Sequence, residues 1–170
     1  MILCIDIGNT STAFGLFNGY EIVYKKQINT FLIAGSSKNS RNPANVILQK
    51  VMLVSKKRGV DVRGVCAASV VPQVSKILLA NIKKIFNIPV VNVDRKTLTG
   101  IKIKVKNPKE VGADRIVNAA CAHHFFGGPC AVVDMGTATT IDCVDKTGNY
   151  IGGSIMPGVD LAARALNEYT

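Results

Sequence analysis

The strongest constraint on the fold of this chain is a short pattern that occurs twice. Each copy is an apolar strand ending in Asp-x-Gly, then small hydroxyl residues and a second apolar strand, at residues 2–12 and 132–141. Each copy continues through a glycine-containing turn into a third strand. Because Asp6 and Asp134 lie a domain length apart, the pattern predicts an internal duplication of a three-stranded unit. Two unrelated hairpins that share turn chemistry are the alternative.

Both turns have the composition of a phosphate site. Glycine and small hydroxyl residues leave backbone N–H groups uncovered, with hydroxyls and a carboxylate beside them. Such groups hold a phosphate and its Mg²⁺. A single Asp-x-Gly-Thr also occurs in ordinary hairpins, so this prediction depends on the repetition.

Length and composition predict a folded protein without a membrane span. The 170 residues allow one domain and part of another, and a hydrophobic content of 48% supplies a core. Apolar runs are shorter than the roughly 20 residues of a membrane helix. The first strand begins at the N-terminus, so we expect no signal peptide.

Cysteine usage is typical of reduced core thiols in a cytoplasmic protein. The cysteines are odd in number, occur in apolar stretches and form no C-x-x-C pair, which disfavours a metal site built from them. They are Cys4, Cys66, Cys121, Cys130 and Cys143.

The formal net charge of +10 admits nucleic acid as a partner, but also phosphorylated small molecules and polyanionic surfaces. Aromatic residues make up only 6% of the chain and tryptophan is absent, so the stacking platform of a single-strand binder is not evident.

The middle of the chain predicts alternating helices and strands. Amphipathic helices are expected over residues 43–57 and 72–86, each with a proline in its first turn. A buried strand is expected over 62–68, a further strand over 88–93, and an exposed loop over 29–42. Together with the first three strands, this order predicts a mixed-sheet α/β fold.

A further helix begins near Gly112-Ala113-Asp114-Arg115. Asp114 is suited to capping that helix, and this purely structural role is one interpretation. The other is a functional carboxylate beside a guanidinium. His123 and His124 on the same helix point about 100° apart, which argues against joint metal ligation.

The last segment predicts a strand, a Gly/Pro turn and a helix over residues 159–169. By the duplication, a complete second half needs further helices and strands. We therefore expect a first domain over 1–111 and the N-terminal part of a second, incomplete domain over 112–170.

Five ordered motifs resemble those of type III pantothenate kinase, a family in the acetate and sugar kinase/Hsp70/actin superfamily. The motifs are Asp6-x-Gly-Asn-Thr10, Ala68-Ser-Val-Val-Pro72, Asn107-Pro-Lys-Glu-Val-Gly-Ala-Asp-Arg115, Asp134-x-Gly-Thr-Ala-Thr-Thr140 and Gly152-Gly through Pro157-Gly158. The resemblance implies duplicated ribonuclease-H-like (actin-like) α/β domains and a cytoplasmic homodimer. It also implies ATP-dependent phosphorylation of pantothenate to 4'-phosphopantothenate, the first step of coenzyme A biosynthesis.

The resemblance also implies roles for individual residues, with Asp114 as the catalytic proton acceptor. The residues implied to bind ATP are Asp6, Ile7, Gly8, Asn9, Thr10, Ser11, Thr12, Ala13 and Thr137. Pantothenate binding falls to Val105, Gly112, Ala113, Asp114 and Arg115. Asp134 holds a monovalent cation, K⁺ or NH₄⁺, and Asp6 holds Mg²⁺ through the phosphates.

Three departures from the family pattern leave alternatives open. Val105 stands where the family usually has a tyrosine on pantothenate, residues 30–42 differ from the expected segment, and the family continues beyond this sequence. The alternatives are a nucleotide-binding, DNA-associated regulator and an inactive or truncated paralogue on the same fold. A ribonuclease-H-like nuclease fits less well, because few carboxylates are available to hold its metals.

Overall fold

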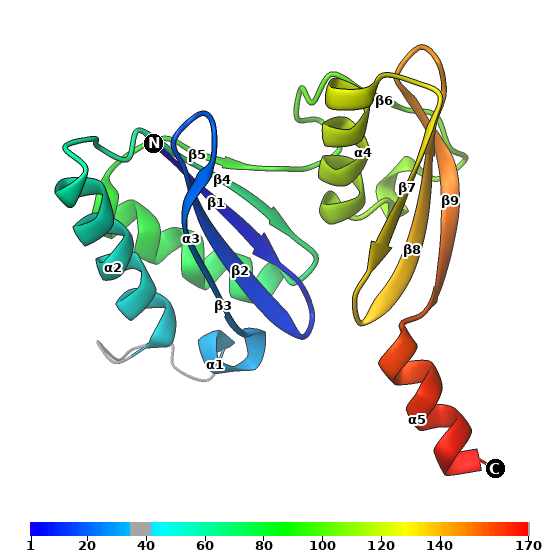
Figure 1. Ribbon diagram of the computed structural model, residues 1–170, viewed down its shortest axis with the longest axis horizontal. Coiled ribbons are helices and arrows are strands. Elements are labelled where there is room, and N and C mark those ends of the chain that lie inside the picture. The colour runs from blue at the N-terminus through cyan, green and yellow to red at the C-terminus, as the bar shows by residue number, and fades with distance from the viewer. Residues whose placement is uncertain (35–41, 170) are drawn as a thin grey trace. The chain divides into compact units, whose positions relative to one another are not determined.

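The computed structural model describes residues 1–34 and 42–169 and divides into two compact units, Met1–Val93 and Asp94–Thr170 (Figure 1). Each unit has its own sheet and its own hydrophobic core. Among the described residues, no helix has the length and apolar character needed to cross a membrane.

The first unit is built on a five-stranded mixed sheet in the order β3-β2-β1-β4-β5. β1 pairs antiparallel with β2 and parallel with β4. The strands are β1 (Ile2–Ile7), β2 (Ser11–Phe17), β3 (Ile22–Asn29), β4 (Gly64–Ser69) and β5 (Val90–Asn92). The predicted strands over 62–68 and 88–93 are therefore present with shifted or shorter bounds.

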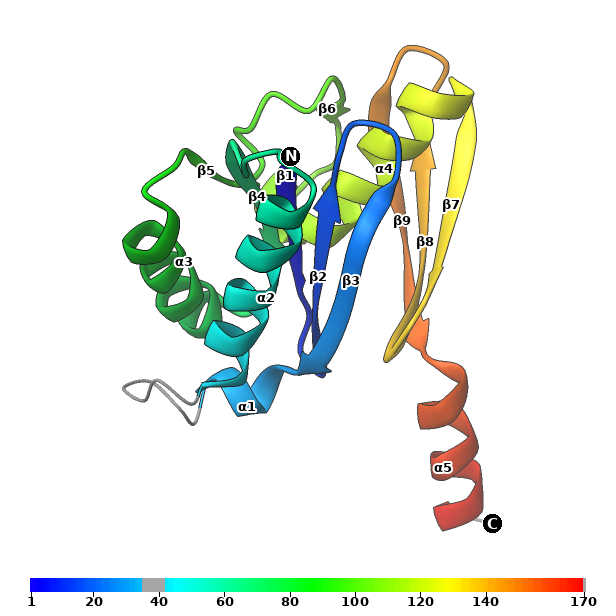
Figure 2. The ribbon, with the colours of Figure 1, turned by 60° about the vertical axis from the view of Figure 1, so that its left-hand side comes forward.

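One face of this sheet carries the core. Alternate residues of β1 and β2 are buried, among them Leu3, Ile5 and Phe14. The helices α2 (Pro43–Lys57) and α3 (Pro72–Phe86) cover that face (Figure 2). Period-two burial is what a sheet with one covered face requires.

The predicted bounds of both long helices are confirmed. α2 begins after Asn42, whose Oδ1 accepts a hydrogen bond from Ala44 N at 2.9 Å, and Pro43 occupies the first turn, where no N–H is needed. α3 ends at Asn87, which adopts a left-handed conformation (φ 47°).

The expected exposed loop over 29–42 is wrong for its first part. Asn29 ends β3, and residues Thr30–Ala34 form a short helix, α1. Asn29 Oδ1 accepts a hydrogen bond from Phe31 N, while Thr30 and Ile33 are buried. Tertiary burial, which the polar composition hides, stabilises this turn of helix. The rest of that expectation, residues 35–41, lies outside the described residues.

The second unit has a four-stranded sheet in the order β6-β9-β8-β7. Its strands are β6 (Lys102–Ile103), β7 (Cys130–Met135), β8 (Ala138–Val144) and β9 (Asn149–Pro157). Its helical segments are the short 3₁₀ helix η1 (Pro108–Glu110), α4 (Ala113–Phe126) and α5 (Val159–Tyr169). The bounds of α5 are those predicted.

Each unit contains three consecutive antiparallel strands of the same kind, β1-β2-β3 in the first and β7-β8-β9 in the second, as the repeated sequence pattern predicts. In the first hairpin Asp6 lies opposite Ala13, whereas in the second Asp134 lies opposite Thr140. The second turn is therefore shorter by one residue.

The boundary between the units differs from the predicted one after residue 111. β6 pairs in parallel with β9, and Ile101, Ile103 and Val105 pack against the core of the second unit. The basic extended segment over 97–105 thus belongs to the second unit, although only two of its residues form strand pairs.

The prediction that the cysteines are core residues is wrong. Cys4 and Cys121 are exposed and the other three are half-buried, and all five are free thiols. Apolar neighbours in sequence do not make a strand residue buried, because successive side chains point to opposite faces of the sheet.

Candidate functional site

In the first unit, the Asp-x-Gly motif forms a tight turn between β1 and β2. Gly8 N donates to Ser11 O at 3.0 Å, and a Cβ on Gly8 would lie 3.1 Å from that oxygen. Asp6, Asn9 and Thr10 are exposed at this end of the hairpin. The turn thus presents a carboxylate, an amide and a hydroxyl, a donor set that suits a phosphate and its cation.

Thr30, the residue that follows β3, holds this turn in place. Its Oγ1 donates to Gly8 O at 2.7 Å and lies 2.9 Å from Thr12 Oγ1, and its N–H donates to Thr10 O at 3.0 Å. Thr12 and Thr30 are both buried. Thr30 is a site residue that sequence reasoning missed, because it lies in the segment interpreted as a loop.

The Ala68-Ser-Val-Val-Pro72 motif lies at the same edge of the first sheet. β1 and β4 are parallel, with Asp6 opposite Ala68 and Ile7 opposite Ser69. Val70 N donates to Ile7 O at 3.1 Å. The carboxyl ends of neighbouring parallel strands meet at one edge, which is the usual place for a ligand in α/β proteins.

The turn between β7 and β8 repeats the arrangement of the turn between β1 and β2, with tighter packing. Gly136 N donates to Ala138 O, and Gly158 N donates to Thr137 O, both at 3.0 Å. Gly158 follows β9 as Thr30 follows β3. A Cβ on Gly158 would lie only 2.1 Å from Gly136 O, so this position must be glycine.

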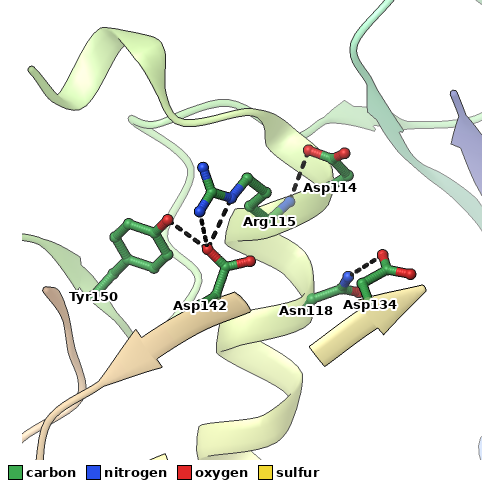
Figure 3. Close-up of polar contacts among 6 residues, drawn as sticks. All are labelled: Asp114, Arg115, Asn118, Asp134, Asp142 and Tyr150. Atoms are coloured by element: carbon green, nitrogen blue, oxygen red, sulfur yellow. Dashed lines mark hydrogen bonds and ion pairs between the residues drawn. The ribbon is translucent and has the colours of Figure 1, made fainter. Parts of the chain in front are cut away.

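Asp134 stands at the end of β7, beside this turn. Its Oδ2 accepts a hydrogen bond from Asn118 Nδ2 of α4 at 2.8 Å, and its side chain is exposed (Figure 3). Asn118 was not predicted as a site residue, and its position one helical turn after Arg115 is the sequence signal that could have indicated it.

Arg115 is directed into the second unit rather than to solvent. Its Nε donates to Asp142 Oδ1 at 2.8 Å, and Nη2 lies 2.6 Å from the same oxygen (Figure 3). Tyr150 OH donates to that oxygen at 2.5 Å, and the guanidinium carbon lies 5.9 Å from the Tyr150 ring centroid. Asp142 is fully buried and the Arg115 side chain is 12% exposed.

The electrostatics of this cluster keep Arg115 charged and Tyr150 neutral. Burial opposes the charge of Arg115, but the hydrogen bond and negative charge of Asp142 raise the pKa of its guanidinium above the ordinary value. Burial, followed by the hydrogen bond to Asp142, raises the pKa of Tyr150 well above its usual range. The cluster is therefore an ion pair capped by a neutral phenol.

Gly153 makes room for this ion pair. A Cβ at Gly153 would lie 1.9 Å from Ile141 O and 2.7 Å from Arg115 Nη2. The close approach of β9 to β8 and to the guanidinium thus explains Gly153, whereas Gly152 has a φ of 130°, which residues with a side chain rarely adopt.

Asp114 is not the N-cap of α4. The N-cap is Gly112, which has no side-chain cap hydrogen bond, and Asp114 lies in the first turn, where a carboxylate suits the helix dipole. Asp114 Oδ1 accepts a hydrogen bond from Arg115 N at 2.8 Å. Its side chain points away from the Arg115 cluster (Figure 3) and is half-buried.

The remaining predicted site residues take ordinary positions in the second unit. Val105 is half-buried against the core around Tyr150, and Thr137 is exposed in the second turn.

Within the described residues, no three or more His, Cys, Asp and Glu side chains gather in a way that could hold a metal. His124 packs edge-on against Phe125.

Replacing Asp142 by alanine is expected to lower the free energy of unfolding of the second unit by about 3–5 kcal/mol, because a buried guanidinium is left without its counter-charge. The measurement is urea denaturation followed by circular dichroism. In the double variant Asp142→Ala/Arg115→Met the loss should be smaller than in Asp142→Ala alone, since no charge remains buried. Strictly additive losses would show that the pair is not coupled.

Comparison with known proteins finds relatives that share one name. The chain is 36% identical over 169 residues to the type III pantothenate kinase of Thermobifida fusca and covers 64% of that protein. It is 40% identical over 171 residues to that of Streptomyces griseus and covers 63% of it. The chain therefore spans a little under two thirds of the length of these relatives.

Solved structures show the same fold at low identity. The ethanolamine utilization protein EutJ of Carboxydothermus hydrogenoformans matches 98% of this chain, with a TM-score of 0.56 at 15% identity and 56% of its own length covered. A Ppx/GppA family member of Aquifex aeolicus matches 99%, with a TM-score of 0.50 at 14% identity and 53% of its length covered. The predicted ribonuclease-H-like (actin-like) α/β fold is confirmed.

The family model described as type III pantothenate kinase matches residues 2–170. With that match over nearly the whole sequence, the chain belongs to the type III pantothenate kinase family.

Proposed function

We propose that the protein phosphorylates pantothenate to 4'-phosphopantothenate with ATP, the first step of coenzyme A biosynthesis. The observation that carries this proposal is the arrangement of Asp114 and Arg115 on α4. Arg115 is fixed in the interior by Asp142 and Tyr150, while Asp114 points away from that cluster. A fixed, partly exposed carboxylate at a helix N-terminus suits a proton acceptor.

The turn of the first unit is proposed to bind the phosphates of ATP. The residues are Asp6, Ile7, Gly8, Asn9, Thr10, Ser11, Thr12 and Ala13, with Thr137 of the second turn as a further contact. Transfer of a γ-phosphoryl group needs positioning and charge neutralisation more than covalent chemistry. Backbone N–H groups and hydroxyls of a braced turn supply the positioning.

The N-terminus of α4 is proposed to bind pantothenate. Asp114 accepts the proton of the attacking primary hydroxyl, and Gly112, Ala113 and Arg115 surround it. Because the Arg115 guanidinium is committed to Asp142, we assign this side chain a positioning role. Val105, in place of the family's usual tyrosine, offers an apolar contact and no hydroxyl.

Two cations are part of the proposal. Asp6 suits Mg²⁺ bound through the phosphates, since hard cations prefer carboxylate oxygens. Asp134 suits a monovalent cation, K⁺ or NH₄⁺, because its carboxylate is exposed and held in place by Asn118. A homodimer and a cytoplasmic location are proposed from the family alone.

A second candidate is a nucleotide-binding regulator that associates with DNA, favoured by the net charge of +10. If the basic surface serves DNA, duplex binding should persist with a salt slope of several units and some sequence preference. For the kinase we expect weak, sequence-indifferent binding that vanishes near physiological salt. Titration of a labelled duplex at several salt concentrations distinguishes the two.

Asp114→Asn is expected to lower kcat for pantothenate by about 10²–10⁴, the usual loss for a positioned general base, with little change in ATP affinity. Asparagine keeps the size and hydrogen-bond acceptor of aspartate and loses only its charge near the helix N-terminus, so the free energy of unfolding should fall by at most about 1 kcal/mol. Steady-state rates and a melting curve test this. Asp160→Asn, an exposed first-turn aspartate of α5, is the matched control. Activity of Asp114→Asn within a few-fold of the parent would contradict the assignment.

Thr30→Val is expected to weaken ATP binding about tenfold or more. Valine has the shape of threonine but leaves Gly8 O and the Thr12 hydroxyl buried without this partner, at a cost of about 1–3 kcal/mol to the turn. Calorimetric titration with Mg-ATP measures the effect, and Thr30→Ser, which keeps the hydroxyl, should restore most of the affinity. Equal affinities in the valine and serine variants would show that the bracing hydroxyl is irrelevant to nucleotide binding.

A further inference from the structure

Two cysteines far apart in the sequence lie side by side in the first sheet. β1 and β4 are neighbouring parallel strands (Figure 1), and Cys4 lies directly opposite Cys66. Residues that lie opposite each other on paired strands project from the same face of the sheet. The two thiols are therefore neighbours on one face.

That face is the one away from α2 and α3. Leu3 and Ile5, which flank Cys4 in β1, are buried in the core beneath the helices. Cys4 itself is exposed and Cys66 is half-buried. Burial, followed by the charge of Cys66, raises the pKa of Cys4, as expected for adjacent thiols.

The strand spacing favours a bridging ligand over a disulfide. Paired strands lie about 4.8 Å apart, and the Cβ atoms of two residues that lie opposite each other are separated by about the same distance. A disulfide needs Cβ atoms about 3.5–4.5 Å apart, so the strands would have to move together. A soft centre with two bonds of about 2.3 Å to sulfur holds the two sulfur atoms well beyond the S–S bond length of about 2.05 Å, so it can join Cβ atoms that lie too far apart for a disulfide.

We propose that Cys4 and Cys66 form a dithiol site for a soft, thiol-seeking centre that takes two sulfur ligands, of the class of monosubstituted trivalent arsenicals. Such a centre completes its coordination with two thiolates and its own organic group. Zn²⁺ usually needs four protein ligands in a structural site. Among the described residues no three or more His, Cys, Asp and Glu gather in a way that could hold a metal, so the pair is matched to a centre that needs only two sulfur ligands.

The binding step is a condensation without electron transfer. The oxygen of an arsenoxide leaves arsenic, two arsenic–sulfur bonds form, and the two thiol protons leave with that oxygen as one molecule of water. Arsenic stays trivalent and neither sulfur is oxidised. No other reactant is required.

The chain supplies its own negative control. Cys130 and Cys143 lie on the neighbouring strands β7 and β8, but Cys130 is opposite Val144 and Cys143 is opposite Ala131. Their side chains therefore project from opposite faces of the second sheet. Cys121, on α4, is exposed and gives a single-thiol comparison.

The experiment uses phenylarsine oxide on the reduced 170-residue chain, with intact mass measured after excess monothiol (2-mercaptoethanol). We expect one arsenical per chain to survive the monothiol and to be released by 2,3-dimercaptopropanol. In Cys4→Ser and in Cys66→Ser, about 100-fold less monothiol should suffice for release, because the second thiol no longer acts at high effective concentration. Cys121→Ser and the double variant Cys130→Ser/Cys143→Ser should match the parent.

Retention of the arsenical by Cys4→Ser or Cys66→Ser at the parent's level would overturn the proposal, as would absence of a retained arsenical on the folded parent. Circular dichroism of each variant and the parallel variant Cys4→Ala separate loss of the site from loss of folding. Zn²⁺ alone should bind the parent no more tightly than it binds Cys4→Ser. These readouts do not depend on kinase activity.

Discussion

The buried contact between Arg115 and Asp142 fixes the part of the second unit on which the proposed chemistry depends. A buried ion pair adds little net stability over an apolar pair, but losing one partner is costly, so the pair fixes geometry. Arg115 ties the first turn of α4 to β8, and Tyr150 adds a tie to β9. Adjacent helix residues point about 100° apart, so anchoring Arg115 inward determines the outward direction of Asp114.

Local signals predicted the long elements well. α2, α3 and α5 have the predicted bounds because prolines mark the starts of the first two and apolar periodicity marks their buried faces. The partners of Arg115 could not be predicted in this way. Asp142 lies 27 residues from Arg115, and in the sequence it is a single polar residue within a strand. Its burial results from the folded sheet and is not visible in the local sequence. Thr30 was missed for the same reason, since α1 is too short to be indicated by propensity.

The duplication explains how two similar turns are braced from equivalent places. In each unit the residue that follows the third strand of the repeat (β3 or β9) donates its N–H to a threonine carbonyl of the turn: Thr30 to Thr10, and Gly158 to Thr137, both at 3.0 Å. The sequence repeat predicted the strands and the turns. It did not predict the brace, because Thr30 and Gly158 have no side-chain chemistry in common.

Because Thr30 holds the first turn and Gly158 holds the second, the two turns differ in the groups that they can present to a ligand. At Thr30 the turn leaves space for a side chain, and its hydroxyl joins Gly8 O and Thr12 in a buried network. At Gly158 the shorter turn approaches so closely that even a Cβ is excluded. The first turn therefore has a rigid hydroxyl-backed frame suited to a multiply charged phosphate chain, whereas the second presents mainly the Asp134 carboxylate and the exposed Thr137. In the proposed function the first turn binds the phosphates and the second binds the cation, so the two copies of one duplicated motif, which differ by one residue in turn length, take different roles.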